Sequence, residues 1–467
     1  MQLEDKKRIY FLAICGTAMA SLAAMLKKKG FDVYGSDQGV YPPMSDFLAE
    51  QNIPVVDGFD PKNLDPAPDL VVVGNVISRG NVEIEEILDQ HIPYISLPDA
   101  LREFLIRGKR SIVVTGTHGK TTTTSMLAWI FDAAGREPSF MVGGIPKNFG
   151  RGFQLGNGED FIIEGDEYDS AYFDKVAKFL RYLPDIGVIN AIEFDHADIY
   201  NSLDDIKLAF QRFVNLIPRR GLLVACKDDA NVMQIAEKAF CPVVTFGLAE
   251  DAAWRVGQIK TTAVSTTFDV IHNNSFWGQA TMSLPGEHNI RNALASIVVA
   301  EHVGIERNII LQGLENFQGV KRRLELKGVV NGIDIYDDFG HHPTAVRQTL
   351  SAFRAQHPDR RIWALYEPRS ATSRRNIFQK EFIESFDDAD FILIAPVHRP
   401  DKAPNGQLFS VEQLARDLTE RGKKSQHLTV EEILSYTKRH AQKGDIIITF
   451  SNGPFEGIHD KLLNSLR

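Results

Sequence analysis

The segment that most constrains the fold is 113–125, VVTGTHGKTTTTS, in which a short apolar run leads into a glycine loop, a lysine and four threonines. The apolar run predicts a buried strand, and the residues after Lys120 predict a helix. Gly116 and Gly119 let the backbone bend so that successive N–H groups face a phosphate, and the helix N-terminus adds its dipole. This order predicts an α/β unit that binds a nucleotide.

Within this loop, Lys120 can reach the β- and γ-phosphates of ATP, and the Thr121 hydroxyl can ligate Mg²⁺. The spacing is shorter than the common G-x-x-x-x-G-K-[ST] pattern, because Val114 stands where its first glycine belongs. An ordinary glycine turn would explain two glycines, but not a lysine and four threonines directly behind a buried strand. The predicted ATP-binding segment therefore comprises Gly116, Thr117, His118, Gly119, Lys120, Thr121 and Thr122.

Strand-like and helix-like runs alternate along the whole chain, which predicts parallel sheets with helical crossovers. Strands are expected at 8–15, 31–37, 69–75, 111–117, 161–167, 185–192 and 221–227, and again at the runs IDIYDD, RIWALYEP, DFILIAPV and DIIITFS. Residues 252–285 alternate in a way that predicts antiparallel strands at a sheet edge, followed by a helix over 289–304. Because 467 residues are too many for one core, we expect three α/β domains, over 1–107, 108–322 and 323–467.

Composition excludes several classes of protein. A net charge of −9 argues against a general nucleic-acid binder. The three cysteines have no metal-ligand spacing and favour a reducing compartment. Residues 1–8 lack the apolar core of a signal peptide, and no run approaches the roughly 20 apolar residues that span a bilayer. We expect a soluble cytoplasmic protein without membrane insertion.

Acidic residues follow the next predicted strand, at Glu164, Asp166, Glu167 and Asp169. Carboxylates this close together repel one another unless a cation lies among them, and Mg²⁺ prefers such oxygen ligands. A solvated acidic turn is the alternative. The strand after that ends at Asp195-His196, where an isolated histidine is usually a solvated loop residue. Because parallel strands place ligands at their carboxyl ends, we expect these strand ends to form one site with the phosphate loop.

Six motifs occur in an order that resembles the Mur ligase family: GTHGKTT, EGDEYD, NAIEFDHAD, GEHNIRNA, RRLE and DDFGHHPT. The resemblance spans the chain. It implies a Rossmann-like N-terminal domain that binds a UDP-sugar, a central P-loop ATPase domain and a C-terminal Rossmann-like ligase domain. It also implies ATP and Mg²⁺ as cofactors, and an amide bond made through an acyl phosphate with release of ADP and phosphate.

The substrates implied by the resemblance are UDP-N-acetylmuramate and a cell-wall peptide. The segments GSDQGVYPPMS, EPRSAT and SNGPFEGIH favour L-alanyl-γ-D-glutamyl-meso-diaminopimelate as the acceptor, with free L-alanine as the alternative. A nicotinamide oxidoreductase is disfavoured, because the first glycine turn lacks G-x-G-x-x-G. A non-catalytic nucleotide switch would not need the DDFGHHPT turn. We expect a monomer or a weak homodimer, with a hinge near 319–323.

The family also implies residue roles. The catalytic group is Lys120, His196 and His341, with His342 able to share the task of His341; the metal ligands are Thr121, Glu164 and His196, with Glu167 as a further candidate. ATP contacts beyond the loop are Asn289, Asn292, Arg323 and Asp338, although Arg322 is an equal match to the arginine position. The UDP-sugar contacts are Gly16, Thr17, Asp37 and Asn75, and the peptide contacts are Arg369, Ser451, Asn452 and His459.

One position departs from the family pattern. Several Mur ligases carry a carbamylated lysine in the helix after the D-H-x-D motif, and that place falls near Gln211 here. We therefore predict no carbamylation. The ligands of a second metal are left open.

Overall fold

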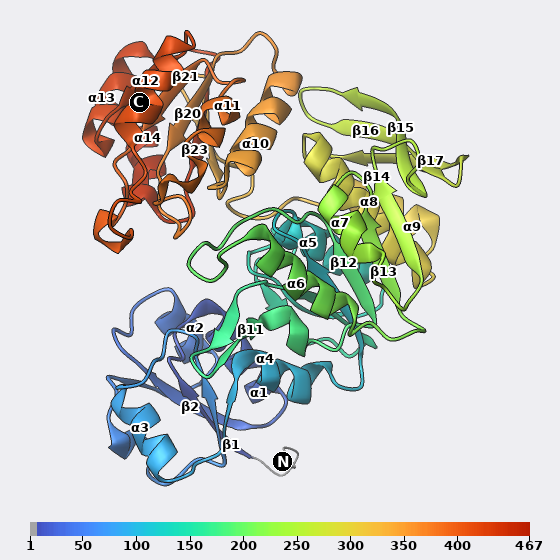
Figure 1. Cartoon of the computed structure of the whole chain (residues 1–467), viewed down its shortest axis with the longest axis vertical. Helices are drawn as coiled ribbons and strands as arrows, with labels where there is room; N and C mark the ends of the chain where they lie inside the picture. Colours follow the sequence, from blue (N-terminus) through green and yellow to red (C-terminus); the bar gives the residue numbers. More distant parts are fainter. Residues whose placement is uncertain (1–6) are drawn as a thin grey trace.

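The computed structural model describes residues 7–467, and most of the segment on which the signal-peptide prediction rests lies outside them. Figure 1 shows three α/β units in series, with the N-terminal and C-terminal units at opposite ends of the central one. Each unit is built around its own main sheet. The three-domain α/β prediction is confirmed, whereas the boundaries at 107/108 and 322/323 stay predictions. Among residues 7–467 no helix is long and apolar enough to cross a membrane.

The N-terminal unit is a parallel five-stranded sheet in the order β3-β2-β1-β4-β5. Its elements are β1 Arg8–Leu12, α1 Thr17–Lys28, β2 Asp32–Asp37, α2 Met44–Glu50, β3 Val55–Asp57, β4 Leu70–Val73, α3 Val82–Asp89, β5 Tyr94–Ser96 and α4 Leu97–Leu101, followed by a π-helical turn at Arg102–Ile106. The predicted strands 8–15 and 69–75 are shorter than expected. Strand β1 ends because Ala13 turns to a φ of +67° and its N–H donates to Ser36 O of β2.

The central unit holds a ten-stranded sheet in the order β17-β16-β15-β14-β13-β12-β6-β9-β7-β8. Its strands are β6 Arg110–Thr115, β7 Ser139–Met141, β8 Phe153–Gln154, β9 Asp160–Glu164, β12 Ile186–Ile189, β13 Leu222–Cys226, β14 Val243–Gly247, β15 Trp254–Thr261, β16 Thr266–His272 and β17 Ser275–Met282. Its helices are α5 Lys120–Ala133, α6 Leu203–Val214, α7 Ala230–Ala236, α8 Glu287–His302 and α9 Arg307–Glu315. The predicted antiparallel strands at the sheet edge are confirmed by β15, β16 and β17.

Two features of this unit were not predicted. A separate two-stranded hairpin, β10 Asp169–Ala171 and β11 Asp174–Ala177, follows the acidic cluster. The helix expected over 289–304 begins earlier, at Glu287, because Gly286 has a φ of +92° and stops the preceding segment there.

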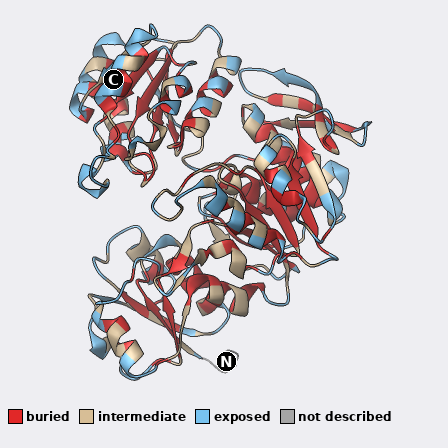
Figure 2. Cartoon of the chain, in the orientation of Figure 1, coloured by how far each residue is buried: buried red, intermediate tan, exposed pale blue. Residues whose placement is uncertain are grey.

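The C-terminal unit is a six-stranded sheet in the order β18-β19-β23-β20-β21-β22. Its elements are β18 Glu325–Val330, β19 Ile333–Asp338, α10 Pro343–Gln356, β20 Ile362–Tyr366, α11 Glu381–Ser385, β21 Phe391–Ile394, α12 Val411–Glu420, β22 Lys424–His427, α13 Val430–His440, β23 Ile446–Phe450 and α14 Ile458–Ser465. Figure 2 shows that the central strands of all three sheets are buried, whereas the exposed residues lie on the outer helices, the loops and parts of edge strands such as β15. Strands enclosed on both faces are continuously apolar, as in parallel sheets generally.

The units differ in how they share cores. One cluster of buried apolar residues runs without a break from the N-terminal sheet, at Ile9, into the central sheet, at Val113. The C-terminal unit has two clusters of its own, one on each face of its sheet. The N-terminal and central units therefore form one body by packing, while the C-terminal unit is a separate body.

Hydrogen bonds attach the linker between these bodies to both of them. Lys321 N donates to Ile145 O of the central unit at 2.9 Å. One residue later, Arg322 O accepts from Phe339 N at 2.8 Å and the Arg322 guanidinium reaches Ser451 O at 2.6 Å, both in the C-terminal unit. The pivot between the units thus lies at the Lys321–Arg322 junction, within the predicted hinge segment.

Candidate active site

The site forms where three neighbouring strands end. Strand β6 lies between β12 and β9, and all three run parallel. Their following loops therefore emerge at one sheet edge, as the sequence pattern predicted. These loops line a cavity of about 1040 Å³, which also has walls from Thr17 of the N-terminal unit and from Arg323, Asp338 and His341 of the C-terminal unit.

The phosphate loop depends on two glycines in left-handed backbone. Gly116 has a φ of +128° and Gly119 a φ of +79°, a region that side chains rarely adopt. A Cβ at Gly119 would lie 2.4 Å from Asn292 Oδ1, so no other residue fits there. Lys120 is the first residue of α5, and its Nζ donates to Gly116 O at 2.7 Å, which holds the ammonium over the loop.

A buried carboxylate, Glu167, lies between the two predicted catalytic cations. Its oxygens lie 2.8 Å from Lys120 Nζ and 3.1 Å from His196 Nε2. Burial opposes the charged forms, but the charge of Lys120 lowers the pKa of Glu167, and the hydrogen bond that His196 donates to Glu167 raises the pKa of His196 to about 8. The sequence suggested Glu167 only as a further metal ligand, because nothing local reveals that it pairs with Lys120.

The predicted metal ligands Glu164 and Thr121 are in contact. Glu164 Oε1 accepts from Thr121 Oγ1 at 2.9 Å, and Glu164 Oε2 accepts from Gly143 N at 2.7 Å. Burial raises the pKa of Glu164, and the charge of Asp166 raises it further. His196 pairs with Glu167, 3.1 Å away. The three predicted ligands thus line one cavity, at its phosphate-loop side.

A chain of amides connects the phosphate loop with helix α8. Thr123 Oγ1 donates to Asn292 Oδ1 at 3.1 Å and accepts from Asn190 Nδ2 at 3.0 Å. Asn292 Nδ2 in turn donates to Asn289 Oδ1 at 3.3 Å. The sequence analysis missed Asn190, whose side-chain oxygen is buried without a partner among the described residues. Its signal was its place directly after a buried strand, beside the glycine loop.

The neighbouring arginines at the linker have different environments. The Arg322 side chain is bound within the C-terminal unit. Its Nε lies 3.2 Å from Asp337 Oδ2, and its Nη2 donates to the backbone carbonyls of Ser451 and Gly453. Arg323 lies over the Phe339 ring, 4.8 Å from its centroid, and no carboxylate pairs with it within residues 7–467. The geometry therefore favours Arg323 as the arginine for ATP. Asp338 Oδ2 accepts from Leu324 N at 2.9 Å and Oδ1 from Gly340 N at 2.8 Å, so one oxygen holds the linker and the other holds the loop after β19.

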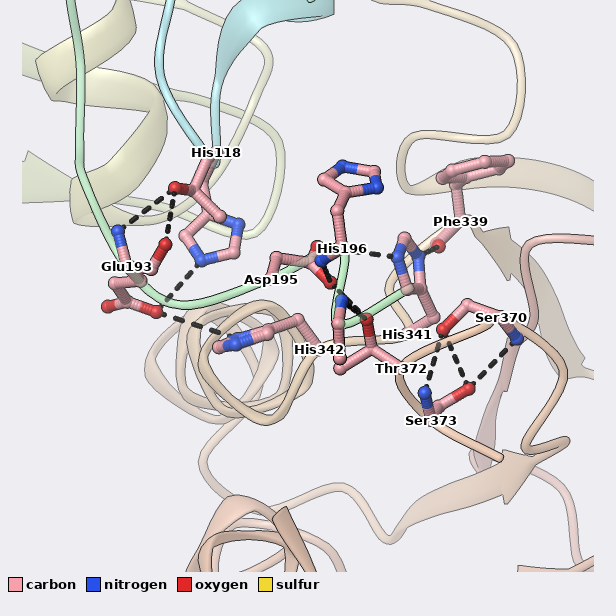
Figure 3. Close-up of polar contacts among 12 residues, drawn as sticks. His118, Glu193, Asp195, His196, Phe339, His341, His342, Ser370, Thr372 and Ser373 are labelled. Atoms are coloured by element: carbon pink, nitrogen blue, oxygen red, sulfur yellow. Dashed lines mark hydrogen bonds and ion pairs between the residues drawn. The ribbon is translucent and has the colours of Figure 1, made fainter. Parts of the chain in front are cut away.

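The histidine pair of DDFGHHPT has two roles in the structure. His341 lines the cavity, its Nδ1 is 3.1 Å from Phe339 O, and burial lowers its pKa. His342 caps helix α10, and its Nε2 donates to Phe194 O of the central unit at 3.2 Å. Figure 3 shows His342 and the phosphate-loop His118 on either side of Glu193. The sequence analysis did not single out Glu193, since its partners lie far away in the chain.

The predicted peptide contacts are spread around the end of strand β23. Asn452 lines the cavity, and its side-chain oxygen is buried without a partner among the described residues. Arg369, Ser451 and His459 do not line this cavity. Ser451 Oγ donates to Glu367 Oε2 at 2.5 Å, Arg369 Nη1 lies 3.6 Å from Glu367 Oε1, and His459 Nε2 lies 2.7 Å from Thr449 Oγ1 and 3.3 Å from Asp337 Oδ1.

The predicted UDP-sugar contacts lie at the strand ends of the N-terminal unit. Gly16 precedes α1, and Thr17, its first residue, lines the cavity. Asp37 Oδ2 accepts from Cys15 N at 2.7 Å, so it holds the turn that carries them. Asn75 is exposed after β4, with its Nδ2 3.4 Å from Asp169 Oδ1 of the central unit. Thr17 and Asn75 thus lie at the junction between the first two units.

The site fits a magnesium nucleotide by its donor set. The loop offers backbone N–H groups at a helix N-terminus and one ammonium, which suit polyphosphate. Thr121 and Glu164 offer hydroxyl and carboxylate oxygens, which suit Mg²⁺. Cysteine ligands are lacking, because Cys226 and Cys241 are buried free thiols and Cys15 belongs to the N-terminal turn.

Comparisons with known proteins agree with this arrangement. Three family models match in order: "Mur ligase family, catalytic domain" over residues 8–109, "Mur ligase middle domain" over 114–300 and "Mur ligase, glutamate ligase domain" over 322–453.

Two curated relatives and one crystal structure illustrate the similarity. The chain is 39% identical to the UDP-N-acetylmuramate–L-alanyl-γ-D-glutamyl-meso-2,6-diaminoheptandioate ligase of Escherichia coli, covering 98% of both chains. It is 34% identical to the UDP-N-acetylmuramate–L-alanine ligase of Caldanaerobacter subterraneus, covering 99% of this chain and 98% of that one. A crystal structure of a murein peptide ligase from Psychrobacter arcticus has 36% identity and a TM-score of 0.71, covering 98% of both chains. With this identity over its whole length, the chain belongs to the Mur ligase family.

Proposed function

We propose that this Mur ligase joins UDP-N-acetylmuramate to L-alanyl-γ-D-glutamyl-meso-diaminopimelate in the cytoplasm, with cleavage of ATP to ADP and phosphate. The observation that carries the proposal is the Lys120–Glu167–His196 array, which lies beside a cavity walled by all three units. A cavity built this way can bring a nucleotide, a nucleotide-sugar and a third substrate together. The tripeptide acceptor is inferred from the relative with 39% identity over 98% of both chains.

The proposed chemistry begins with attack of the muramate carboxylate on the γ-phosphate, which forms an acyl phosphate and releases ADP. The peptide amine then attacks the acyl carbon, and phosphate leaves. Magnesium-bound ATP supplies the activated phosphoryl group. The first step brings anions together, so Lys120 offsets their repulsion from the phosphate loop, where Glu167 and Gly116 O hold its ammonium in place.

The remaining roles divide between the units. Glu164 and Thr121 would hold the metal, while Asn289 and Asn292 would contact the nucleotide from α8. Arg323 is free of carboxylate partners among the described residues and closes over the phosphates from the linker. His341, whose pKa is lowered by burial, is neutral at physiological pH and can accept a proton from the attacking amine. The amine loses a proton during the second step, and a neutral histidine that lines the cavity can act as the general base that accepts it.

The test is product mass spectrometry with UDP-N-acetylmuramate, ATP and Mg²⁺. Wild type should form the tripeptide product, and Lys120→Ala should reduce turnover by at least about 1000-fold while the circular dichroism spectrum is unchanged. Lys402→Ala, which removes an exposed lysine of the C-terminal unit, is the matched control and should keep full activity. Ligation by Lys120→Ala near the wild-type rate would refute the role of Lys120.

The second candidate is ligation of free L-alanine, which the relative with 34% identity supports. Both reactions share the muramate carboxylate and the acyl phosphate, so only the acceptor separates them. A panel of L-alanine, the tripeptide, and the corresponding tetra- and pentapeptides decides between them. Phosphate release with L-alanine but not with any peptide would overturn the tripeptide assignment.

A further inference from the structure

The loop that carries His196 is held at nearly every residue by the C-terminal unit. Residues 193–197 follow strand β12 of the central unit. The contacts of this loop are Glu193 Oε2 with Thr344 Oγ1 at 2.8 Å, Phe194 O with His342 Nε2 at 3.2 Å, Asp195 Oδ1 with Thr372 Oγ1 at 2.7 Å, and Ala197 O with Arg375 Nη1 at 2.6 Å. The C-terminal unit therefore contacts this loop at four of its five residues, in addition to the hydrogen bond from Glu193 N to Thr117 Oγ1 of the central unit at 2.9 Å.

His196 itself has unusual backbone. Its φ is +52°, in the left-handed region that a residue with a Cβ adopts only when its surroundings hold it there. Ile199 N and Tyr200 N donate to His196 O on one side of the turn, and on the other side Asp195 Oδ1 accepts from His196 N at 2.7 Å. The same oxygen accepts from Thr372 Oγ1. One carboxylate oxygen thus connects the strained turn to the C-terminal unit.

Thr372 completes this connection in both directions. Its hydroxyl donates to Asp195 Oδ1 and accepts from Ala197 N at 3.3 Å, so it joins the residues before and after His196. Both Thr372 and Asp195 are buried, at 4% and 6% exposure, so water does not replace these bonds. A threonine hydroxyl is suited to the task, since it can be donor and acceptor at once.

The turn that presents Thr372 is itself rigid. Ser373 Oγ accepts from Ser370 N at 2.9 Å, and Ser370 Oγ accepts from Ser373 N at 2.9 Å. Figure 3 shows this reciprocal pair on one side of Thr372 and Asp195 on the other. Since the turn belongs to the C-terminal unit, Thr372 moves with that unit as one body.

We propose that Thr372 is a positioning residue for His196, through which the docking of the C-terminal unit sets the metal and phosphate side of the site. When the C-terminal unit is away, Asp195 loses its hydroxyl partner and the left-handed turn relaxes, so His196 leaves the position beside Glu167. The nucleotide site is then complete only when the third unit has docked. This inference rests on the proposed function for the role of His196, but its geometry does not depend on the acceptor.

The test compares Thr372→Val with Thr372→Ser. Valine keeps the shape but removes the hydroxyl, and serine restores the hydroxyl alone. Thr372→Val should lower kcat by about 100-fold, the effect expected for a misplaced catalytic group, and raise the Mg²⁺ concentration for half-maximal activity, with KM for UDP-N-acetylmuramate within about twofold. Thr372→Ser should recover most of kcat. The matched control is Thr437→Val, which removes another buried hydroxyl of the same unit, one that donates to Ile433 O of its own helix at 2.7 Å.

Hydrogen exchange supplies a readout without turnover. In the metal-free protein, the peptide covering 193–200 should exchange at least about tenfold faster in Thr372→Val than in wild type, and Thr437→Val should leave it unchanged. Unchanged exchange in Thr372→Val, or a serine variant as impaired as the valine variant, would overturn the inference. Failure of wild type to ligate any acceptor would refute the proposed function instead, and the exchange experiment would still decide this inference.

Discussion

The two junctions of the central unit are held by different kinds of interaction. Its junction with the N-terminal unit is part of one continuous apolar core, in which α4 packs against the central hairpin strand β10 and the short helical turn at Lys178–Arg181. Its junction with the C-terminal unit is made largely of hydrogen bonds to the loop 193–197. Apolar packing is non-directional and adds to stability, whereas hydrogen bonds across a surface have small net energies and need one geometry.

This difference explains how the cavity can keep a stable half and still open when the C-terminal unit moves away. The half that carries the phosphate loop and the UDP-sugar turn is held together by shared apolar packing. The half that carries Arg323, Asp338 and His341 is attached by polar contacts that water can replace when the units separate. The pivot at Lys321–Arg322 allows that separation without breaking either core. Such polar interfaces within a chain are typical of domains that move.

The largest expected effect on stability comes from removing apolar volume from the core that the N-terminal and central units share. Leu101 of α4 is fully buried within it, and Leu101→Ala should lower the free energy of unfolding by about 2–5 kcal/mol. Because the core is shared, calorimetry should show the N-terminal and central units melting together at a lower temperature. The matched variant Leu418→Ala, fully buried in the separate C-terminal core, should shift only the C-terminal transition. A shift of all units by both variants would remove the distinction between the junctions.

Much of the site could be predicted from sequence because its chemistry is local. The phosphate loop is one uninterrupted segment, and Glu164 and His196 stand at successive strand ends that a parallel sheet must bring together. The same reasoning gave the α/β fold and the antiparallel edge. The order of residues in a few short segments is enough to predict the phosphate loop, the strand-end residues and the antiparallel edge.

The contacts across the polar junction could not be predicted in this way. Thr372 and Asp195 are 177 residues apart, and Thr344 and Glu193 are 151 apart. Both threonines are ordinary surface residue types, and nothing near them in sequence indicates a partner. The pairing of Glu167 with Lys120 is hidden for the same reason, since a carboxylate in an acidic cluster predicts a metal as readily as an ion pair. Packing of separate units decides the contacts of the two threonines, and the folding of the central unit decides the pairing of Glu167 with Lys120.

Acid should open the polar junction next. Burial, with the charge of His118 adding to it, lowers the pKa of His342 to about 4, although Asp195 and Glu193 oppose this shift; the ordinary value is 6.5. A histidine whose folded pKa is depressed contributes stability that is full above pH 6.5 and is lost as the pH falls towards 4. Small-angle scattering should therefore show the wild-type radius of gyration rising over this window, while the secondary structure stays intact.

The variant that checks this is His342→Gln, which keeps an amide donor but cannot titrate. Its radius of gyration should depend less on pH than that of wild type between pH 6.5 and 4. Identical profiles for the two proteins would assign the opening to other groups, of which Glu193 and His118 face the same position.

A smaller effect is expected at Arg375. Its guanidinium donates to Ala197 O at 2.6 Å and is held by Gln407 Oε1 at 2.9 Å. Arg375→Ala should reduce kcat by about tenfold, because each hydrogen bond to the loop contributes about 1.5 kcal/mol when a charged group makes it. The N-terminal and central melting transition should not change. Arg416→Ala, on the outer face of α12, should leave both quantities unaltered, and equal loss in the two variants would exclude a specific role for Arg375.

The smallest expected effect is at Thr344, and it tests whether the polar junction is a sum of modest bonds. Thr344 Oγ1 donates to Glu193 Oε2, which also accepts from His118 Nε2 at 3.0 Å. Removing the hydroxyl in Thr344→Val therefore leaves Glu193 with a partner, so the loss should be about 0.5–1.5 kcal/mol in the stability of docking. Thr419→Val, at an exposed site of α12, should lose nothing measurable. A loss at Thr344 as large as that at Leu101 would mean that the junction is held by one dominant contact, and the C-terminal unit could not then be released by small changes in its surroundings.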